Sequence, residues 1–131
     1  MRRALSIFVT SLALLACSPA EQGSAGADLG QAALLEQLRS PNPPLVLDVR
    51  TPAEFASGHV PGAQNVPIDE LSSHLDALAP ARDREVVVYC ERGPRARRAQ
   101  AVLGEAGFAD VRHLEGDMSA WRDGRLPCDG C

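Results

Sequence analysis

Hydrophobic positions along the chain form short runs that predict buried strands. Residues 45–49 are a continuous apolar run interrupted only by Asp48, and residues 85–89 are β-branched and uncharged after the first position. Strands covered on both faces lack the polar alternation of half-exposed ones, so both runs are typical of a parallel sheet. Two shorter strands are expected, one at 65–66 and one at 111–114.

Apolar side chains recur at helical spacing between these runs, for example at Leu71, Leu75 and Leu78. Strands that alternate with helices predict an α/β fold of three layers, with a mostly parallel sheet of four or five strands flanked by helices. The first expected helix is capped by Asp28 and runs to about Arg39. The other expected helices are at 52–57, from Asp69 onward, from near Arg95 to Ala106, and at 118–122.

The first 16 residues have the pattern of an export signal. A basic start is followed by an apolar run over residues 4–16, which is too short to span a membrane, because spanning takes about 20 residues. Its length and flanks are those of a signal-peptide core. A short buried helix is the alternative. Residues 17–27 are small and polar and are expected to form a flexible tether.

The end of this signal resembles a lipoprotein processing site. Residues 14–17, Leu-Leu-Ala-Cys, are similar to the lipobox of bacterial lipoproteins, which implies cleavage before Cys17 and lipidation of its thiol. Ser18 follows, where an Asp would favour the inner membrane, so an outer-membrane lipoprotein facing the periplasm is expected. Ordinary cleavage at Ser18-Pro19-Ala20 is the alternative, and it would give a soluble periplasmic protein.

Charge and cysteine content narrow the functional classes. The net charge is −4, which argues against a nucleic-acid partner. If Cys17 is lipidated, three cysteines remain, and an odd number suggests one pair and one free reactive thiol. Cys128 and Cys131 are the expected pair, which leaves Cys90 free. Two cysteines fall short of the usual four ligands of a structural zinc, so no metal or cofactor is expected.

Cys90 directly follows the strand at 85–89, at the edge where parallel sheets bind ligands. The loop it begins leads into a helix near Arg95, whose N–H groups and dipole would stabilise an anion. The thiolate of Cys90 is therefore expected to be favoured. Gly93 allows a tight loop, while Pro94 removes one N–H donor. A buried core thiol is the alternative for Cys90.

Three segments resemble the signatures of rhodanese domains, in the same order and at fitting spacings: residues 47–67, 89–96 and 114–121. The resemblance covers about residues 28–127 and leaves 128–131 as a Cys-x-x-Cys tail. One departure is Asp117, where the family often has a second glycine. Asp117 is far from the loop in sequence, so this departure puts little of the resemblance in doubt.

The resemblance implies a sulfurtransferase without a cofactor. The Cys90 thiolate would take sulfane sulfur from a small anionic donor such as thiosulfate, and the persulfide would pass it to cyanide or a thiol. Asp48 and Arg50 would hold the framework behind the loop. The residues expected to bind substrate are Glu91, Arg92, Gly93, Pro94, Arg95 and Ala96.

Three other functions stay open at this stage. The loop from Cys90 to Arg95 has six residues, one fewer than in the related phosphatases, which disfavours an exported phosphatase. A non-catalytic rhodanese-like binding module is disfavoured by the presence of Cys90. A dithiol oxidoreductase would work through Cys128 and Cys131, although no helix follows them. The same pair could instead resolve the Cys90 persulfide. Structural roles are expected for His59 and Trp121. His74 is expected to be partly exposed, and the sequence assigns no function to His113.

Overall fold

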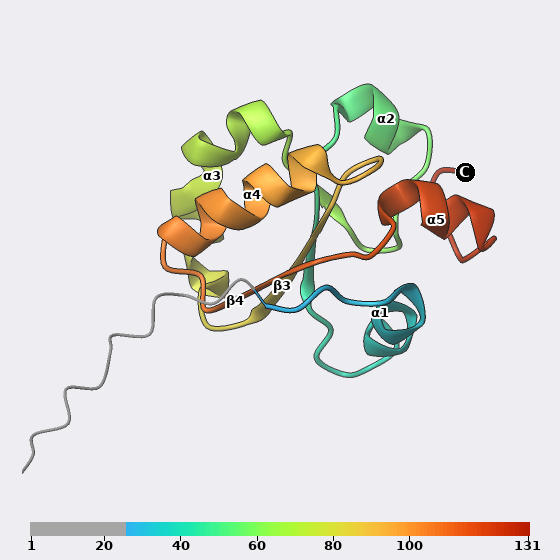
Figure 1. Cartoon of the computed structure of the whole chain (residues 1–131), viewed down its shortest axis with the longest axis horizontal. Coiled ribbons are helices and arrows are strands. Elements are labelled where there is room, and N and C mark those ends of the chain that lie inside the picture. The colour runs from blue at the N-terminus through green and yellow to red at the C-terminus, as the bar shows by residue number, and fades with distance from the viewer. Residues whose placement is uncertain (1–25) are drawn as a thin grey trace, which may run out of the picture.

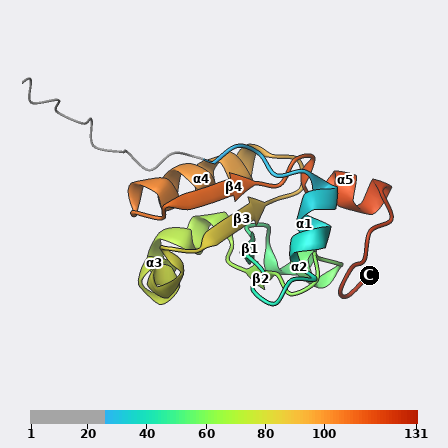
Figure 2. The ribbon, with the colours of Figure 1, turned by 90° about the horizontal axis from the view of Figure 1, so that it is seen from below.

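The structure, a computed structural model, describes residues 26–131. The expected signal peptide, Cys17 and most of the expected tether therefore lie outside the described residues. In the described chain, helices surround one sheet of parallel strands (Figure 1). The sheet has four strands in the order β2-β1-β3-β4 (Figure 2). The strands are β1 (Leu45–Asp48), β2 (Gln64–Asn65), β3 (Glu85–Tyr89) and β4 (Asp110–His113).

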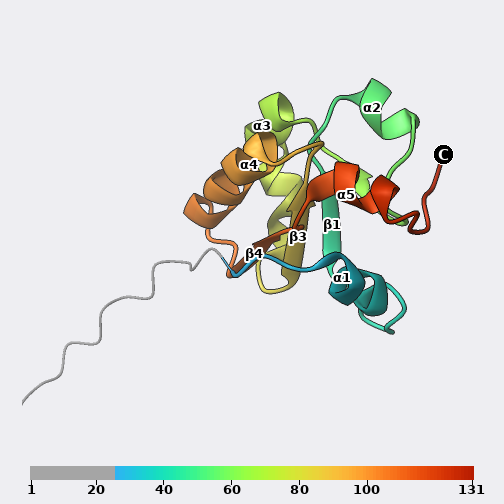
Figure 3. The ribbon, with the colours of Figure 1, turned by 45° about the vertical axis from the view of Figure 1, so that its right-hand side comes forward.

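Helices cover both faces of this sheet (Figures 2 and 3). α1 (Gln31–Gln37) and α5 (Asp117–Asp123) pack on one face, and α3 (Leu71–Leu78) and α4 (Pro94–Glu105) pack on the other. α2 (Pro52–Ala56) follows β1, and two 3-10 turns at Ile68–Glu70 and Ala79–Ala81 flank α3. The predicted three-layer α/β class is confirmed.

The two central strands are buried on both faces, which explains their continuous apolar sequences. Val46 and Val87 pack with the helices α1 and α5. Leu47 and Val88 point the opposite way and pack with α3 and α4. Because successive side chains of a strand alternate between faces, each central strand contributes to both hydrophobic clusters.

The predicted start of the first helix is wrong. α1 begins at Gln31, after Gly30, and Asp28 does not cap it. Instead, Leu29 adds a single parallel bridge beside Leu114 at the edge of the sheet. Its N–H donates to His113 O at 2.8 Å, so the backbone before α1 is satisfied by the sheet. The predicted helix from Asp69 also begins later, since Asp69 lies in the 3-10 turn that precedes α3.

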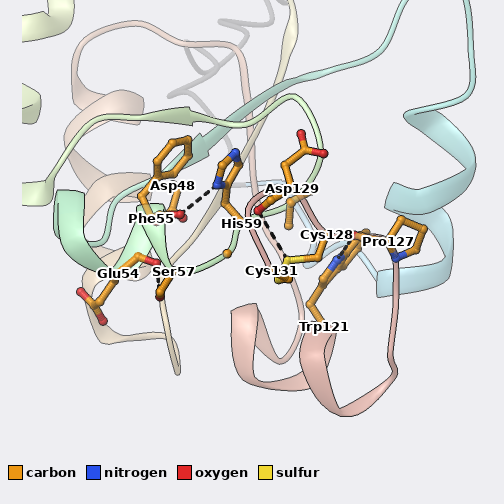
Figure 4. Close-up of a disulfide and its surroundings, with 12 residues drawn as sticks. Asp48, Glu54, Phe55, Ser57, His59, Trp121, Pro127, Cys128, Asp129 and Cys131 are labelled. Carbon is orange, nitrogen blue, oxygen red and sulfur yellow. Dashed lines mark hydrogen bonds between the residues drawn. A yellow bond between two sulfur atoms is a disulfide. The ribbon is translucent and has the colours of Figure 1, made fainter.

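The C-terminal tail folds back onto the segment that follows α2. Cys128 and Cys131 form a disulfide in the structure (Figure 4). Between them, Asp129 exchanges two backbone hydrogen bonds of 2.9 Å with His59. The indole N–H of Trp121 donates to Pro127 O at 2.7 Å. The tail is thereby tied to both α5 and the segment at 58–59.

The disulfide packs directly against the α-carbon of Gly58. A Cβ at this position would collide with Cys131 Sγ and would lie 3.1 Å from Cys128 Sγ. Gly58 also has φ +132°, which side-chain-bearing residues rarely adopt. Gly62 has φ +76°, but nothing lies within 4 Å of its Cβ position. Both glycines have a positive φ, but only Gly58 has atoms of the tail at its Cβ position.

We expect Gly58→Ala to lower the free energy of unfolding by about 1–3 kcal/mol more than Gly62→Ala, because only the first overpacks the disulfide. Chemical denaturation of both variants in the oxidised state measures this difference. In a background carrying Cys131→Ala, Gly58→Ala should cost less free energy of unfolding than it does in the parent, because one of the two sulfurs near its Cβ is removed. The loss caused by Gly62→Ala should be the same in both backgrounds. Equal losses in the two glycine variants would contradict the packing explanation.

Candidate active site

Cys90 lies immediately after β3 and is 1% exposed. It is the one free cysteine among residues 26–131. The chain then curls back, so that the N–H of Gly93 donates to Cys90 Sγ at 3.0 Å. Gly93 makes this turn at φ +121°, where a side chain would be strained. The turn at Gly93 therefore aims a backbone donor at the sulfur of Cys90.

The loop leads directly into α4, whose twelve residues begin at Pro94. The N–H groups in the first turn of a helix have no partner within the helix, so those of Arg95 and Ala96 are available to an anion. Pro94 contributes no donor but is well placed at the first helical position. The predicted arrangement of a loop followed by a helix N-terminus is therefore present at Cys90.

Arg95 is fixed beside the loop by a residue of α2. Its guanidinium makes two hydrogen bonds to Glu54, of 2.7 and 2.9 Å. These bonds hold the pKa of Glu54 at about 2. Glu54 and, more weakly, Cys90 raise the pKa of Arg95 further above its usual range, although burial opposes the shift. Arg95 therefore stays charged and oriented at any pH at which the protein works.

Glu54 was missed as a site residue by the sequence analysis, although it lies within one of the signature segments. It also closes a capping box with Thr51, whose backbone N–H and hydroxyl donate to it at 3.0 Å. The Thr-x-x-Glu spacing before a helix is a recognisable capping signal. The spacing alone did not indicate that the same carboxylate would also reach across to α4.

Asp48 and Arg50 form a buried ion pair behind the loop. Arg50 Nη2 donates to Asp48 Oδ2 at 2.7 Å and to the carbonyl of Gly58 at 2.7 Å. Its Nη1 reaches Glu91 Oε2 at 3.3 Å. Burial opposes the charge of Arg50, but Asp48 outweighs it and raises the pKa of Arg50. This guanidinium connects the loop at Glu91 to the segment at Gly58 on which the tail lies.

The start of α5 holds the other side of the loop. The N–H groups of Met118 and Ser119 donate to the carbonyls of Cys90 and Glu91, at 3.1 and 3.2 Å. Asp117 Oδ1 accepts the N–H of Cys90 at 2.9 Å. Asp117 is only 1% exposed. Although it is distant from the loop in sequence, Asp117 therefore lies against the loop in the structure.

The contact between Asp117 and Cys90 follows from the sheet. β3 and β4 are parallel neighbours, so the residues after β4 meet the residues after β3 at the same edge. Sequence separation hid this proximity. The predicted strands came without an order in the sheet, so the sequence did not specify which strand would lie next to the one that precedes Cys90.

His113, at the end of β4, had no assigned function from sequence. Its Nε2 lies 2.9 Å from Asp117 Oδ2, and its Nδ1 lies 3.5 Å from Asp28 Oδ2. Asp28 is in turn held by Arg97 at 2.6 and 2.8 Å. Arg97, with a smaller contribution from His113, lowers the pKa of Asp28. A polar chain therefore runs from Cys90 through Asp117 and His113 to the surface.

Comparison with known proteins identifies the family. A family model described as Rhodanese-like domain matches residues 31–123, which is most of the chain. The chain belongs to the rhodanese-like domain family. The resemblance inferred from the three signature segments is confirmed.

Relatives of this rhodanese-like domain include sulfurtransferases. A sulfurtransferase of Allochromatium vinosum is 33% identical over 76% of this chain and 92% of its own length. A thiosulfate sulfurtransferase of Escherichia coli is 33% identical over 53% of this chain and 67% of its own. In other matches the domain is only part of a longer protein. The match covers 26% of a probable adenylyltransferase/sulfurtransferase of Mycobacterium tuberculosis.

Solved structures agree on the fold. A rhodanese-related protein from Thermoplasma volcanium superposes with a TM-score of 0.70 at 28% identity, covering 80% of this chain and 99% of that one. A thiosulfate sulfurtransferase from Pseudomonas aeruginosa gives a TM-score of 0.71 at 28% identity, covering 79% of this chain but 19% of that one. The rhodanese-like domain thus corresponds to one unit of the larger protein.

The remaining loop residues of this rhodanese-like domain contribute differently. The side chain of Glu91 turns away from the loop centre and is held by Arg50 and Arg122. The side chain of Arg92 is exposed, and Ala96 is buried beneath the first turn of α4. The side chain of Glu91 is therefore held by two arginines, whereas Arg92 is open to solvent.

The tail disulfide between Cys128 and Cys131 lies on the opposite side of the sheet from Cys90. Cys90 packs in the cluster beneath α3 and α4, whereas Cys128 packs against the cluster beneath α1 and α5. No hydrogen bond joins Cys90 to the tail within residues 26–131. This arrangement does not support the predicted role of Cys128 and Cys131 in resolving the persulfide. The tail instead packs against Gly58 and His59.

The other singled-out side chains have structural contacts. His59 stacks on Phe55 with ring centroids 3.6 Å apart, and its Nδ1 lies 2.9 Å from Phe55 O (Figure 4). His74 is half-buried, with its Nδ1 2.9 Å from Glu70 O, and Trp121 is fully buried. No cluster of three potential metal ligands occurs within residues 26–131. In the same range, no helix is long and apolar enough to cross a membrane.

Proposed function

We propose that this protein is a sulfurtransferase that carries sulfane sulfur on Cys90. The observation that carries the proposal is the hydrogen bond from Gly93 N–H to Cys90 Sγ at the start of α4. It combines a nucleophile, a backbone donor and a helix N-terminus in one six-residue loop. The sulfurtransferases among the relatives support the same chemistry.

The proposed first half-reaction loads the cysteine. The Cys90 thiolate attacks the outer sulfur of thiosulfate, a bond forms between the two sulfurs, and the sulfur–sulfur bond of thiosulfate breaks. Sulfite leaves with the electron pair. Arg95, oriented by Glu54, and the exposed Arg92 attract the dianionic donor. The N–H groups at the start of α4 then stabilise the anionic persulfide.

The second half-reaction unloads the persulfide. A thiolate or cyanide attacks the outer sulfur, the bond to Cys90 Sγ breaks, and Cys90 leaves as a thiolate ready for the next cycle. The product is a new persulfide or thiocyanate. Because donor and acceptor use the same sulfur in turn, ping-pong kinetics are expected. An export signal at 1–16 and an anchor at Cys17 would place this reaction on the periplasmic side of a membrane.

Two alternatives are less well supported by the geometry. A phosphatase needs a longer loop for a phosphate-sized group, whereas the loop from Cys90 to Arg95 has six residues. A thioredoxin-like dithiol lies at a helix N-terminus, which lowers the pKa of one thiol. Cys128 and Cys131 are not in a helix.

Intact mass measurement tests the proposal. The full chain carrying Cys17→Ser is incubated with thiosulfate and then desalted, so that Cys90 is the one thiol outside the tail disulfide. We expect the mass to increase by one sulfur atom and to return to its starting value after cyanide. Cys90→Ser should gain nothing. A variant with serine at both 128 and 131 should gain the same sulfur as the parent.

Each outcome decides a separate point. No gain on a parent whose Cys90 is free and reduced would overturn thiosulfate as donor, and failure with an organic persulfide as well would favour a binding module. A gain that persists in Cys90→Ser would contradict Cys90 as the carrier. Loss of the gain in the variant lacking Cys128 and Cys131 would restore a catalytic role to the tail.

A further inference from the structure

A buried carboxylate lies directly beneath the proposed nucleophile. Asp117 Oδ1 accepts the N–H of Cys90 at 2.9 Å. Its other oxygen lies 3.5 Å from the Cβ position of Gly93, the residue whose N–H reaches the sulfur. Asp117 therefore binds the first residue of the loop, and its second oxygen lies near Gly93.

Such a carboxylate would oppose the chemistry if its charge were not balanced. A nearby negative charge disfavours a second negative charge, and the effect is strong where water is excluded. The thiolate and the persulfide of Cys90 are both anions. An unpaired charge on Asp117 would therefore make Cys90 a poorer nucleophile, against the effects of Gly93 and α4.

The other charged groups around the loop are already paired. From α2 and α4, Glu54 holds Arg95. Behind the loop, Arg50 is shared by Asp48 and Glu91, and Arg122 of α5 also bonds Glu91. From the segment before α1, Asp28 is held by Arg97 of α4. The group left to balance Asp117 is His113 of β4.

His113 has a carboxylate oxygen beside each ring nitrogen. Nε2 faces Asp117 Oδ2 at 2.9 Å, and Nδ1 faces Asp28 Oδ2 at 3.5 Å. Nδ1 is buried and makes no hydrogen bond in the described residues. A proton on both nitrogens would turn a donor toward each carboxylate, and the four groups Arg97, Asp28, His113 and Asp117 would then sum to zero charge.

We propose that Asp117 and His113 form a positioning pair for Cys90, in which Asp117 holds the Cys90 N–H and a proton on His113 cancels the carboxylate charge beneath the thiolate. The inference rests on the proposed function only in taking Cys90 as the reacting group. It assigns functions to a residue at a position where the family often has glycine and to a histidine that the sulfur-transfer mechanism does not use.

Two conservative substitutions separate the charge from the hydrogen bonds. Asp117→Asn keeps an oxygen acceptor for Cys90 N–H, and asparagine tolerates the φ of +55° found at this position. It removes the negative charge, so Cys90 should ionise at lower pH. His113→Gln keeps a donor toward Asp117 but removes the positive charge, so Cys90 should ionise at higher pH.

Thiolate absorbance near 240 nm, followed against pH, measures the effect without any sulfur transfer. The full chain carrying Cys17→Ser is used with its tail disulfide intact, and the curve of the Cys90→Ser variant is subtracted. We expect the midpoint to fall by about one pH unit in Asp117→Asn and to rise by about one in His113→Gln. The double variant should lie near the parent. His74→Gln, on the exposed side of α3, should not change it.

Opposite shifts are a result that a merely structural role would not give. The proposal is overturned if both variants shift the midpoint in the same direction, or if Asp117→Asn leaves it unchanged while retaining the parent's melting temperature. If His113→Gln fails to fold, the Asp117→Asn shift decides alone. The predicted shifts in a protein that takes no sulfur from any donor would support the pair while overturning the proposed function.

Discussion

Replacing Arg50 with methionine is expected to lower the free energy of unfolding by about 3–5 kcal/mol, the largest loss of stability we predict. Arg50 and Asp48 are 1% and 0% exposed. Methionine fills similar space but leaves the Asp48 carboxylate buried with no opposite charge. It also leaves the Gly58 carbonyl without this donor, and Glu91 keeps Arg122 as its arginine partner. A buried charge without a partner is far more unfavourable than a lost surface contact.

Urea denaturation of the parent and the variant measures this loss. Arg39→Met is the matched control, because Arg39 is 65% exposed and lies 3.7 Å from Glu36. Surface pairs of this kind are worth little, so its stability should change by less than about 0.5 kcal/mol. Adding Asp48→Asn to Arg50→Met should recover part of the loss, since the unpaired charge is then removed. A loss in Arg50→Met no larger than in Arg39→Met would refute the buried ion pair as a stabilising unit.

Replacing Arg95 with methionine is expected to reduce kcat/KM for thiosulfate about 10- to 100-fold, the largest effect on activity that we predict outside Cys90. A hydrogen bond to a charged group is worth about 1.5–3 kcal/mol, which corresponds to that range. Arg95 is held in place by Glu54 before any donor arrives, so little ordering is needed on binding. The loss should appear in the loading step, because thiosulfate is the dianionic reactant.

Rapid-mixing kinetics of Cys90 loading measure this effect. Arg98→Met is the control, because Arg98 lies on the same helix, is 67% exposed and approaches Asp69 only to 3.9 Å. Its loading rate should change less than twofold. An uncharged organic trisulfide should distinguish the two variants much less than thiosulfate does. An equal loss with charged and uncharged donors would mean that Arg95 acts on the loop rather than on the anion.

The sequence was sufficient for the fold because its strongest signals are local. The apolar runs ending at Asp48 and Tyr89 became the two central strands, and the segment around Cys90 became the predicted loop and helix N-terminus. Asp28 shows the limit of such reasoning. It had the composition of a helix cap, but pairing of Leu29 with the sheet edge determined the backbone there.

The supporting residues of the site were harder to predict because they depend on which strands are neighbours. Glu54 reaches Arg95 across 41 positions of sequence, and Asp117 reaches Cys90 across 27. No local pattern encodes either contact. The departure from the family signature at Asp117 was visible in the sequence, but its meaning required the adjacency of β3 and β4.

The strand order β2-β1-β3-β4 has a consequence for the origin of the site. The chain leaves β1 toward one edge of the sheet and leaves β3 toward the other, so the connections diverge between these two strands. A crevice at such a topological switch point exists whatever residue follows the strand. A relative that lacked the cysteine would therefore keep the anion-accepting loop and the helix N-terminus. Anion binding and sulfur chemistry are thus separable in this fold. A single substitution at position 90 would remove the sulfur chemistry and leave the anion binding.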